Sequence, residues 1–151
     1  MGEQTCGIGV ATANSPQGPF TDHGKMFRSN EIGVQNSIDP SLLQYEGRNY
    51  LVWGSFRGIY VIELTADGLS IMPGAKKKRI AGTAFEAVYI HKHDDYYYMF
   101  ASIGSCCQGV KSTYKVVVGR SKKVWGPYKD KTGKPMLKNG YSLVIGANDH
   151  F

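Results

Sequence analysis

The sequence of 151 residues lacks any long apolar run. No window approaches the roughly 18 consecutive apolar residues that a transmembrane helix needs. The first residues, Met1 to Thr5, also lack the charged and apolar regions of a signal peptide. We therefore expect a soluble chain with no membrane partner.

Cysteine is scarce and odd in number, with only Cys6, Cys106 and Cys107 present. Their spacing matches neither a disulfide framework nor a zinc site. A disulfide between adjacent cysteines is strained, whereas a thiol packs well as a small apolar group. We therefore expect Cys106 and Cys107 to be two buried thiols in a tight loop, and a vicinal disulfide stays open as the alternative.

Helical periodicity is also missing, because apolar residues recur in short β-branched and aromatic runs. Hydrophobic residues make up 42% of the chain and aromatic residues 12%, and there are 19 glycines. This composition is typical of a folded, turn-rich protein and not of a disordered one. The length fits one domain.

The formal charge of +6 could indicate an anionic partner, but four basic residues form one run, Lys76 to Arg79, beside Pro73 and Gly74. No aromatic platform or nucleic-acid motif surrounds this run. We interpret it as a solvated loop and expect no nucleic-acid partner.

Two segments repeat each other at a spacing of 47 residues. DPSLLQYEGRNYLVWGS, from Asp39, aligns without a gap with EAVYIHKHDDYYYMFAS, from Glu86. Each segment has a carboxylate, an apolar run, a polar turn and an aromatic run that ends in small residues. Repeats of about 40 to 50 residues that contain several short strands are typical of β-propeller blades.

The repeats predict an all-β fold, part of a β-propeller with about two and a half to three blades. Residues 5–30 would form the outer strands of one blade, residues 36–75 a second blade and residues 83–135 a third. Residues 141–151 would start the next blade, with Leu143, Val144 and Ile145 in its first strand.

Asp39 and Glu86 occupy the same place in the two repeats, at the start of a first strand. The innermost strands of a propeller line its central channel, so we expect these carboxylates to converge there. Two carboxylates in a partly desolvated pocket push each other's pKa values apart, and such a pair suits glycoside hydrolysis. The alternative, that both carboxylates only cap strand starts, stays open.

Five stretches together resemble glycoside hydrolase family 43 and, within it, the arabinan endo-1,5-α-L-arabinosidases. They are NSIDPSLL from Asn36, GSFRG from Gly54, FEAVYI from Phe85, SCCQGVKSTYKVVVGRS from Ser105 and GPYKDKTGKPML from Gly126. The resemblance implies a central fragment, without the first and last blades, of a five-bladed β-propeller. It implies hydrolysis of α-1,5-linked arabinan with inversion, and a related β-xylosidase or α-L-arabinofuranosidase is the alternative enzyme.

The resemblance also implies roles for single residues. Glu86 matches the general acid, which an apolar, carboxylate-rich setting would keep protonated. Asp39 matches the acid that orients the general acid and raises its pKa. The sugar-binding segments of the family cover Asn36, Ser37, Ile38, Ser55, Phe56 and Arg57.

Two functional segments of the family have no counterpart here. The catalytic base lies in a His-Asp-Pro-type segment, but the one Asp-Pro is Asp39-Pro40, and Asp22 lies in a Gly-Pro edge motif. The histidine that contacts a calcium or other ion lies in a Gly-Pro-Gly-His-type segment, which His150 does not match. We therefore expect no cofactor or metal in this chain.

Without its base an inverting hydrolase loses most of its rate, so a non-catalytic carbohydrate-binding or assembly fragment is the alternative function. The expected partners are arabinan or arabino-oligosaccharides. An open arc of blades also exposes apolar faces, which predicts self-association or association with the missing blades. Family members are commonly secreted or cell-surface bacterial enzymes, and the localisation of this chain stays open.

Overall fold

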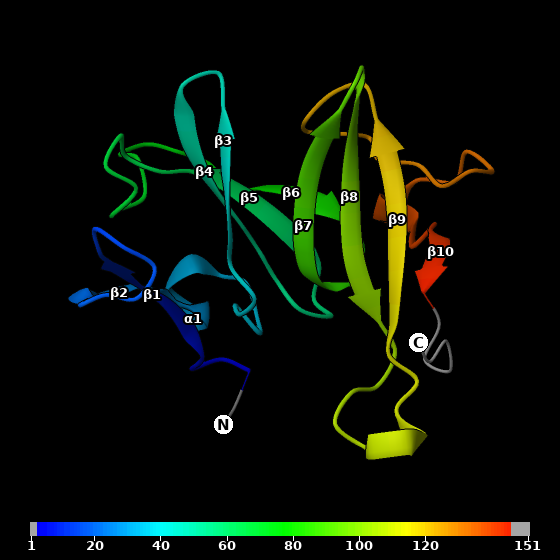
Figure 1. Ribbon diagram of the computed structural model, residues 1–151, viewed down its shortest axis with the longest axis horizontal. Coiled ribbons are helices and arrows are strands. Elements are labelled where there is room, and N and C mark those ends of the chain that lie inside the picture. Colours follow the sequence, from blue (N-terminus) through cyan, green and yellow to red (C-terminus); the bar gives the residue numbers. More distant parts are fainter. Residues whose placement is uncertain (1–2, 146–151) are drawn as a thin grey trace.

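The computed structural model describes residues 3–145, and within this range nearly all regular structure is β-strand (Figure 1). The helical elements are short: α1 (Ser29–Ile32), η1 (Gly109–Lys111) and η2 (Met136–Lys138). None of the helices in this range is long and apolar enough to cross a membrane. The fold is therefore built by strand pairing.

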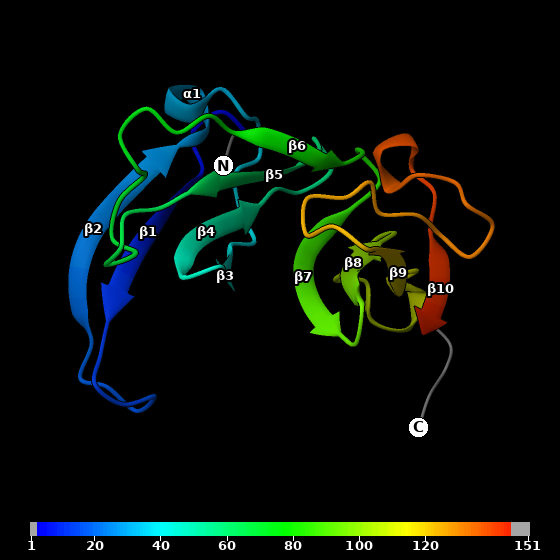
Figure 2. The same ribbon diagram turned by 90° about the horizontal axis from the view of Figure 1, so that it is seen from above.

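The strands form three antiparallel sheets that stand side by side (Figures 1 and 2). The first sheet pairs β1 (Gly7–Thr12) with β2 (Thr21–Arg28). The second has the order β3 (Ser41–Tyr45), β4 (Arg48–Trp53), β5 (Ile59–Glu63) and β6 (Lys78–Ala81). The third has the order β7 (Glu86–His93), β8 (Tyr96–Ile103), β9 (Lys115–Ser121) and β10 (Ser142–Ile145).

The two repeats of the sequence become equivalent hairpins, β3–β4 and β7–β8. Glu46 and Gly47 join the first pair with φ of 50° and 72°, and a two-residue loop with positive φ at both residues matches the right-handed twist of the strands. Asp94, with φ of 49°, lies in the corresponding turn of the second hairpin. The residues of these short turns thus allow the first two strands of each four-stranded sheet to pair.

The second sheet is buried on both faces. Successive side chains of its strands point to opposite faces, so one face packs on the first sheet and the other on the third. Leu51 and Trp53 pack into a core with Phe27 of the first sheet. Val52, between them, packs on the opposite face into a core with Phe85 and other residues of the third sheet. This arrangement is expected of propeller blades, since one blade cannot bury its apolar faces alone.

The fourth strand of each large sheet lies beyond the range that the sequence predicted for its blade. In the second sheet it is β6, which follows residue 75. In the third it is β10, which pairs with β9, so the prediction that Leu143 to Ile145 start another blade is wrong. The intervening chain makes bridges at Lys129 with Arg120 and Pro135 before it returns to the sheet. Because this connection is long, the spacing of the repeats does not predict that the fourth strand belongs to the same sheet. The remainder of the predicted next blade, residues 146–151, lies outside the described residues.

The prediction of two buried thiols is also wrong, because Cys106 and Cys107 form a vicinal disulfide and both residues are exposed. They lie in the connection between β8 and β9, which extends away from the sheets (Figure 1). A projecting loop has no packed surroundings that could bury a thiol. The third cysteine, Cys6, is free.

Exposed apolar side chains occur at the outer strand of the third sheet, where Leu143 and Val144 are 57% and 45% exposed. An apolar surface of this kind is expected where a sheet lacks a neighbour. Association of the chain with a second copy, or with further blades, stays a prediction.

Candidate active site

The structure brings Asp39 and Glu86 together at the starts of the two innermost strands. Asp39 lies two residues before β3, and Glu86 is the first residue of β7. The hydroxyl of Ser41 donates a hydrogen bond of 2.8 Å to the carbonyl oxygen of Val88, which ties the two strands together at equivalent positions of the repeat. The negative charge of Glu86 acts on Asp39 strongly enough to change its pKa.

A β-bulge sets the direction of Glu86. Glu86 pairs with Ser102, but the next pair along the strands is Tyr89 with Phe100, so β7 contains one extra residue. Within the bulge Ala87 has φ of 50°, an unfavourable value for alanine. Bulges commonly re-aim a side chain next to an active site. The extra residue therefore lets Glu86 face the start of β3.

Glu86 is held by a chain of hydrogen bonds from the second sheet. The hydroxyl of Ser55 donates to Oε2 of Glu86 at 2.7 Å. Nδ2 of Asn36 in turn donates to the hydroxyl and the carbonyl oxygen of Ser55, at 2.9 and 3.1 Å. Ser55 is only 1% exposed, so it positions Glu86 and has little surface for a sugar. The predicted sugar contact of Ser55 is thus corrected to a contact with the acid itself.

Sequence reasoning missed Tyr114, which contacts the same carboxylate. Ser102 pairs with both Glu86 and Val116, and Tyr114 lies two residues before Val116. Burial raises the pKa of the Tyr114 hydroxyl, and its hydrogen bond with Ser102 opposes this effect, whereas its hydrogen bond with Glu86 adds to it. This tyrosine lies in the STYK part of the stretch that resembles the family, so the resemblance could have indicated Tyr114 as a residue of the site.

The backbone around the carboxylates is unusual. Asn36, Asp39 and Phe56 have φ of 53°, 55° and 50°, and Ala87 shares this region. Positive φ is tolerated by asparagine and aspartate but costs energy for phenylalanine and alanine. Residues in strained conformations cluster at functional sites, which supports a role for this region beyond packing.

Burial raises the pKa of Asp39, and the negative charge of Glu86 raises it further, while a hydrogen bond from the backbone N–H of Ala87 partly opposes both effects. An acid whose pKa is raised by folding binds its proton more tightly in the folded state. Stability then falls as the pH rises from the unfolded pKa through the folded one, and the penalty persists at neutral pH.

We therefore expect Asp39→Asn to stabilise the chain at pH 7. Asparagine keeps the positive φ and an oxygen for the N–H of Ala87, but removes the repelling charge. Because Asp39 is partly exposed, the gain should be at most about 1 kcal/mol, or about 2 to 4 °C in melting temperature. Thermal unfolding at pH 7 and pH 3 measures it, and the gain should vanish at pH 3, where both states are protonated.

Asp95→Asn is the matched control, since Asp95 is exposed in the turn between β7 and β8. It should leave the melting temperature unchanged at both pH values. A lower melting temperature for Asp39→Asn at pH 7 would show that repulsion at Asp39 does not outweigh its contacts.

Ser37 was predicted to bind sugar, but its side chain is fully buried. Its hydroxyl donates to the carbonyl oxygen of Val34 at 2.8 Å and accepts a hydrogen bond from Nε1 of Trp53 at 3.1 Å. Its backbone N–H donates to the hydroxyl of Ser29 at 3.0 Å. This corrects the prediction, because the side chain of Ser37 supports the segment that leads to Asp39 and offers no surface to a sugar.

The remaining predicted sugar-binding residues lie around the carboxylates. The exposed guanidinium of Arg57 makes two hydrogen bonds to the carboxylate of Glu3, at 2.6 and 2.9 Å. The backbone N–H of Phe56 donates to the carbonyl oxygen of Phe85 at 2.9 Å, which ties this loop to the start of β7. Ile38, like Phe56, is half-buried. Sugar contacts of Asn36, Ile38, Phe56 and Arg57 stay predictions.

The expectation that this chain holds no cofactor or metal stays a prediction. Within residues 3–145 no three side chains of His, Cys, Asp or Glu gather as the ligands of a metal would. We therefore assign no chemical step to a metal.

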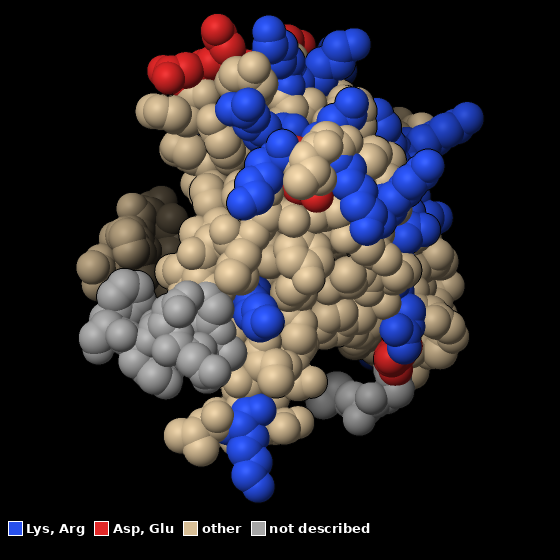
Figure 3. All heavy atoms as spheres, turned by 90° about the vertical axis from the view of Figure 1, so that its right-hand side faces the viewer, with Lys and Arg blue, Asp and Glu red and all other residues tan. Residues whose placement is uncertain are grey.

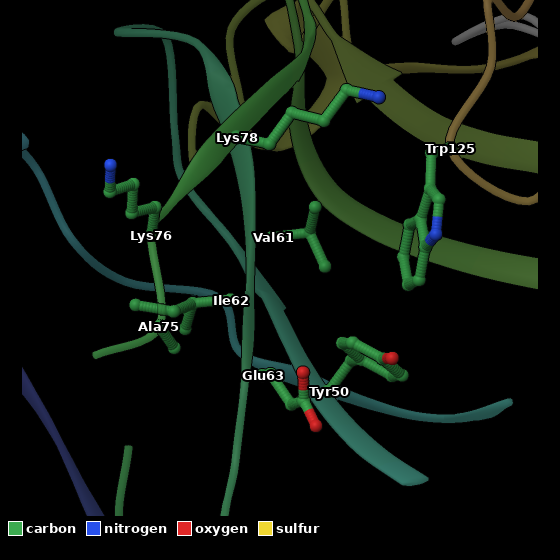
Figure 4. Close-up of a pocket in the computed structure, with 8 residues that line it drawn as sticks. All are labelled: Tyr50, Val61, Ile62, Glu63, Ala75, Lys76, Lys78 and Trp125. Atoms are coloured by element: carbon green, nitrogen blue, oxygen red, sulfur yellow. The ribbon is translucent and has the colours of Figure 1, made fainter. Parts of the chain in front are cut away.

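A pocket between the second and third sheets lies apart from the carboxylates (Figure 4). Tyr50 and Trp125 face each other across it with ring centroids 4.7 Å apart. Glu63, at its edge, already pairs with Arg48 at 3.3 Å. The close aromatic contact indicates that these residues pack the second sheet against the third, and we assign no chemistry to this pocket.

The chain is similar in sequence to enzymes that act on arabinan. It is 38% identical to the extracellular endo-α-(1→5)-L-arabinanase 1 of Bacillus subtilis (strain 168), in a match that covers 100% of this chain and 49% of that protein. It is 39% identical to the extracellular exo-α-(1→5)-L-arabinofuranosidase ArbA of Cellvibrio japonicus (strain Ueda107), over 98% of this chain and 49% of that protein. The chain thus spans about half the length of these curated relatives.

Solved structures share the fold. The α-L-arabinanase of Cellvibrio cellulosa in complex with arabinohexaose superposes with a TM-score of 0.86 at 34% identity, over 96% of this chain and 53% of that one. The family 43 endo-arabinanase from Bacillus licheniformis gives a TM-score of 0.86 at 38% identity, over 98% and 53%. Such arabinanases are five-bladed β-propellers, and this chain has the fold of about half of one. Residues 1–150 match the glycosyl hydrolases family 43, and the chain belongs to that family.

Proposed function

We propose that this protein hydrolyses α-1,5-linked L-arabinan with inversion of configuration, with Glu86 as the general acid and Asp39 as the residue that orients it. The observation that carries the proposal is the pairing of these carboxylates, in which Ser55 holds Oε2 of Glu86 at 2.7 Å and Asp39 is close enough for its pKa to respond to Glu86. The arabinanases among the relatives support the substrate class.

The contacts of Glu86 suit the donation of a proton. Ser55 donates to Oε2 and Tyr114 hydrogen-bonds to the same carboxylate, so both hold the acid in place as it gives its proton to the glycosidic oxygen. After transfer the carboxylate is ionised, and the hydrogen bond from Ser55 then stabilises the charge that has formed. Asp39 places a second carboxylate beside the acid, and burial together with the charge of Glu86 raises the pKa of Asp39.

The attacking water needs a base on the other face of the sugar, and in inverting enzymes the two carboxyl groups lie about 6.5 to 9.5 Å apart. Asp39 is the residue that we propose to orient Glu86, whose charge helps to raise the pKa of Asp39. Asp22, on β2, accepts a hydrogen bond from the backbone N–H of Gly24 and is exposed. We assign the role of base to neither residue.

Two relatives that match nearly the whole chain are named extracellular enzymes. Action outside the cell is therefore part of the proposal, because a polymer such as arabinan reaches an enzyme most readily there. The vicinal disulfide is compatible with an oxidising compartment.

Sugar release from linear α-1,5-arabinan, with β-1,4-xylan as the competing substrate, tests the proposal. We expect arabinose or arabino-oligosaccharides from arabinan, and proton NMR of the first product should show the β-anomer, as inversion at an α-linkage requires. Faster release from xylan would favour a β-xylosidase, and an α-anomer would contradict inversion. If neither polymer is cut, the proposal fails, and calorimetry with arabinotriose would then test sugar binding without hydrolysis.

A further inference from the structure

The positive charge of the chain is concentrated in one segment. Residues 115–138 contain eight of the 18 basic residues and one of the 12 acidic residues, so their formal charge of +7 exceeds the +6 of the whole chain. The eight are Lys115, Arg120, Lys122, Lys123, Lys129, Lys131, Lys134 and Lys138. Figure 3 shows lysine and arginine side chains gathered on the side of the molecule that carries the outer strands of the third sheet.

Part of this segment lines a groove. Two cavities, of about 390 and 490 Å³, share Arg120, Lys129 and Lys131 and therefore adjoin. Lys122 and Lys123 line the second cavity as well. We call these five side chains and the two cavities the basic groove. Its volume falls in the range of sites that hold a ligand, of about 300 to 1,000 Å³.

The cations of the basic groove are not neutralised by the protein. All five are exposed, and no acidic residue within residues 3–145 forms an ion pair with any of them. Asp130, the one acid in the groove, accepts hydrogen bonds at Oδ1 from the backbone N–H groups of Thr132 and Lys134 at 2.8 and 2.9 Å, and its single charge leaves the five cations in excess. Like charges held together at a surface attract a polyanion, and salt weakens that attraction.

The aromatic lining argues against a single-stranded nucleic acid. Such ligands stack their bases on exposed aromatic faces. The ring of Tyr96 in the groove is instead covered by the guanidinium of Arg120, 4.5 Å from its centroid, and by Nζ of Lys122 at 5.7 Å. Tyr98, the other aromatic residue of the groove, is half-buried beside Tyr96, with ring centroids 6.4 Å apart. Neutral arabinan, for its part, carries no anionic group that could pair with these cations.

We infer that the basic groove binds an acidic polysaccharide, a sugar polymer with carboxylate groups along its chain. The choice of a sugar polymer rests on the proposed function, whereas the negative charge of that polymer is inferred from the groove alone. The groove lies on β9 and the segment that follows it, whereas Glu86 lies on β7, on the other side of β8. A second binding surface of this kind would hold the protein on an acidic polymer while the carboxylate site acts on a neighbouring chain.

Binding to polygalacturonate tests the inference, with fully methyl-esterified polygalacturonate as the neutral probe of the same backbone. We expect binding to the acid polymer alone, weaker at higher salt. Lys129→Glu with Lys131→Glu should weaken it about tenfold or more. The matched control is Lys76→Glu with Lys77→Glu, which makes the same change in net charge in the segment before β6. Figure 4 shows Lys76 pointing away from Trp125.

Several outcomes would overturn the inference. They are equal binding of both polymers, equal loss in the two double variants, and tighter binding of a DNA duplex than of polygalacturonate. The proposed function is tested separately, because the Lys129 and Lys131 double variant should cut soluble neutral arabinan at the unchanged rate. Loss of arabinan hydrolysis with polygalacturonate binding retained would sink only the proposed function.

Discussion

Replacement of Glu86 by glutamine is expected to lower the rate of arabinan hydrolysis by about 10²- to 10⁴-fold, the usual contribution of a general acid. Glutamine keeps the size of the side chain and an oxygen that accepts the hydrogen bond from Ser55, but it has no proton to give. The stability of the chain should change little, so the loss can be assigned to chemistry. Steady-state rates of sugar release from linear arabinan measure it.

A substrate that needs no acid separates this role from a general disturbance of the site. 4-Nitrophenyl α-L-arabinofuranoside has a leaving group that departs without protonation, so Glu86→Gln should lose much less activity on it than on arabinan. Glu46→Gln is the control, because Glu46 is exposed in the turn between β3 and β4. Equal losses on both substrates would show that Glu86 is not the acid.

The largest expected effect on stability is that of Trp53→Ala, which should lower the free energy of unfolding by about 3 to 5 kcal/mol. Trp53 is fully buried between Phe27 and Tyr60, with ring centroids 5.4 and 5.8 Å away. Alanine would leave a cavity in the core between the first and second sheets. It would also remove the donor that Ser37 accepts from.

Urea unfolding of the wild type, Trp53→Ala and Trp53→Phe measures this effect. Phenylalanine fills most of the space but cannot donate to Ser37, so it should cost clearly less than alanine, about 1 to 2 kcal/mol. If alanine cost no more than phenylalanine, the core at Trp53 would not be filled by its ring. The comparison separates the packing of the ring from its hydrogen bond.

Trp53 links the stability of the fold to the candidate site. Its N–H reaches Ser37, which lies between Asn36 and Asp39 in the chain, and Asn36 donates to Ser55, which holds Glu86. The acid is therefore supported by a buried network and not by the loop alone. A rigid support of this kind suits a proton donor, because a small displacement of a catalytic group lowers the rate strongly.

The sequence by itself was sufficient for the fold class and for the pair of carboxylates. Asp39 and Glu86 occupy one position of a repeated pattern, and equivalent positions in neighbouring modules lie next to each other. Strand alternation and turn residues are local properties, so the hairpins β3–β4 and β7–β8 could be predicted from the pattern of residues.

Tertiary structure alone decided what each side chain contacts. Ser37 and Ser55 both looked available to a sugar, yet packing against other sheets buries both hydroxyls. β10 pairs with the sheet that precedes it in the chain, after a long connection. Cys106 and Cys107 form an exposed disulfide. Lysines from separate positions in the sequence line one groove. The burial of a side chain and its contacts depend on residues that are distant in the chain. A repeated sequence pattern shows which residues lie in equivalent strands, but not which distant residues pack against them.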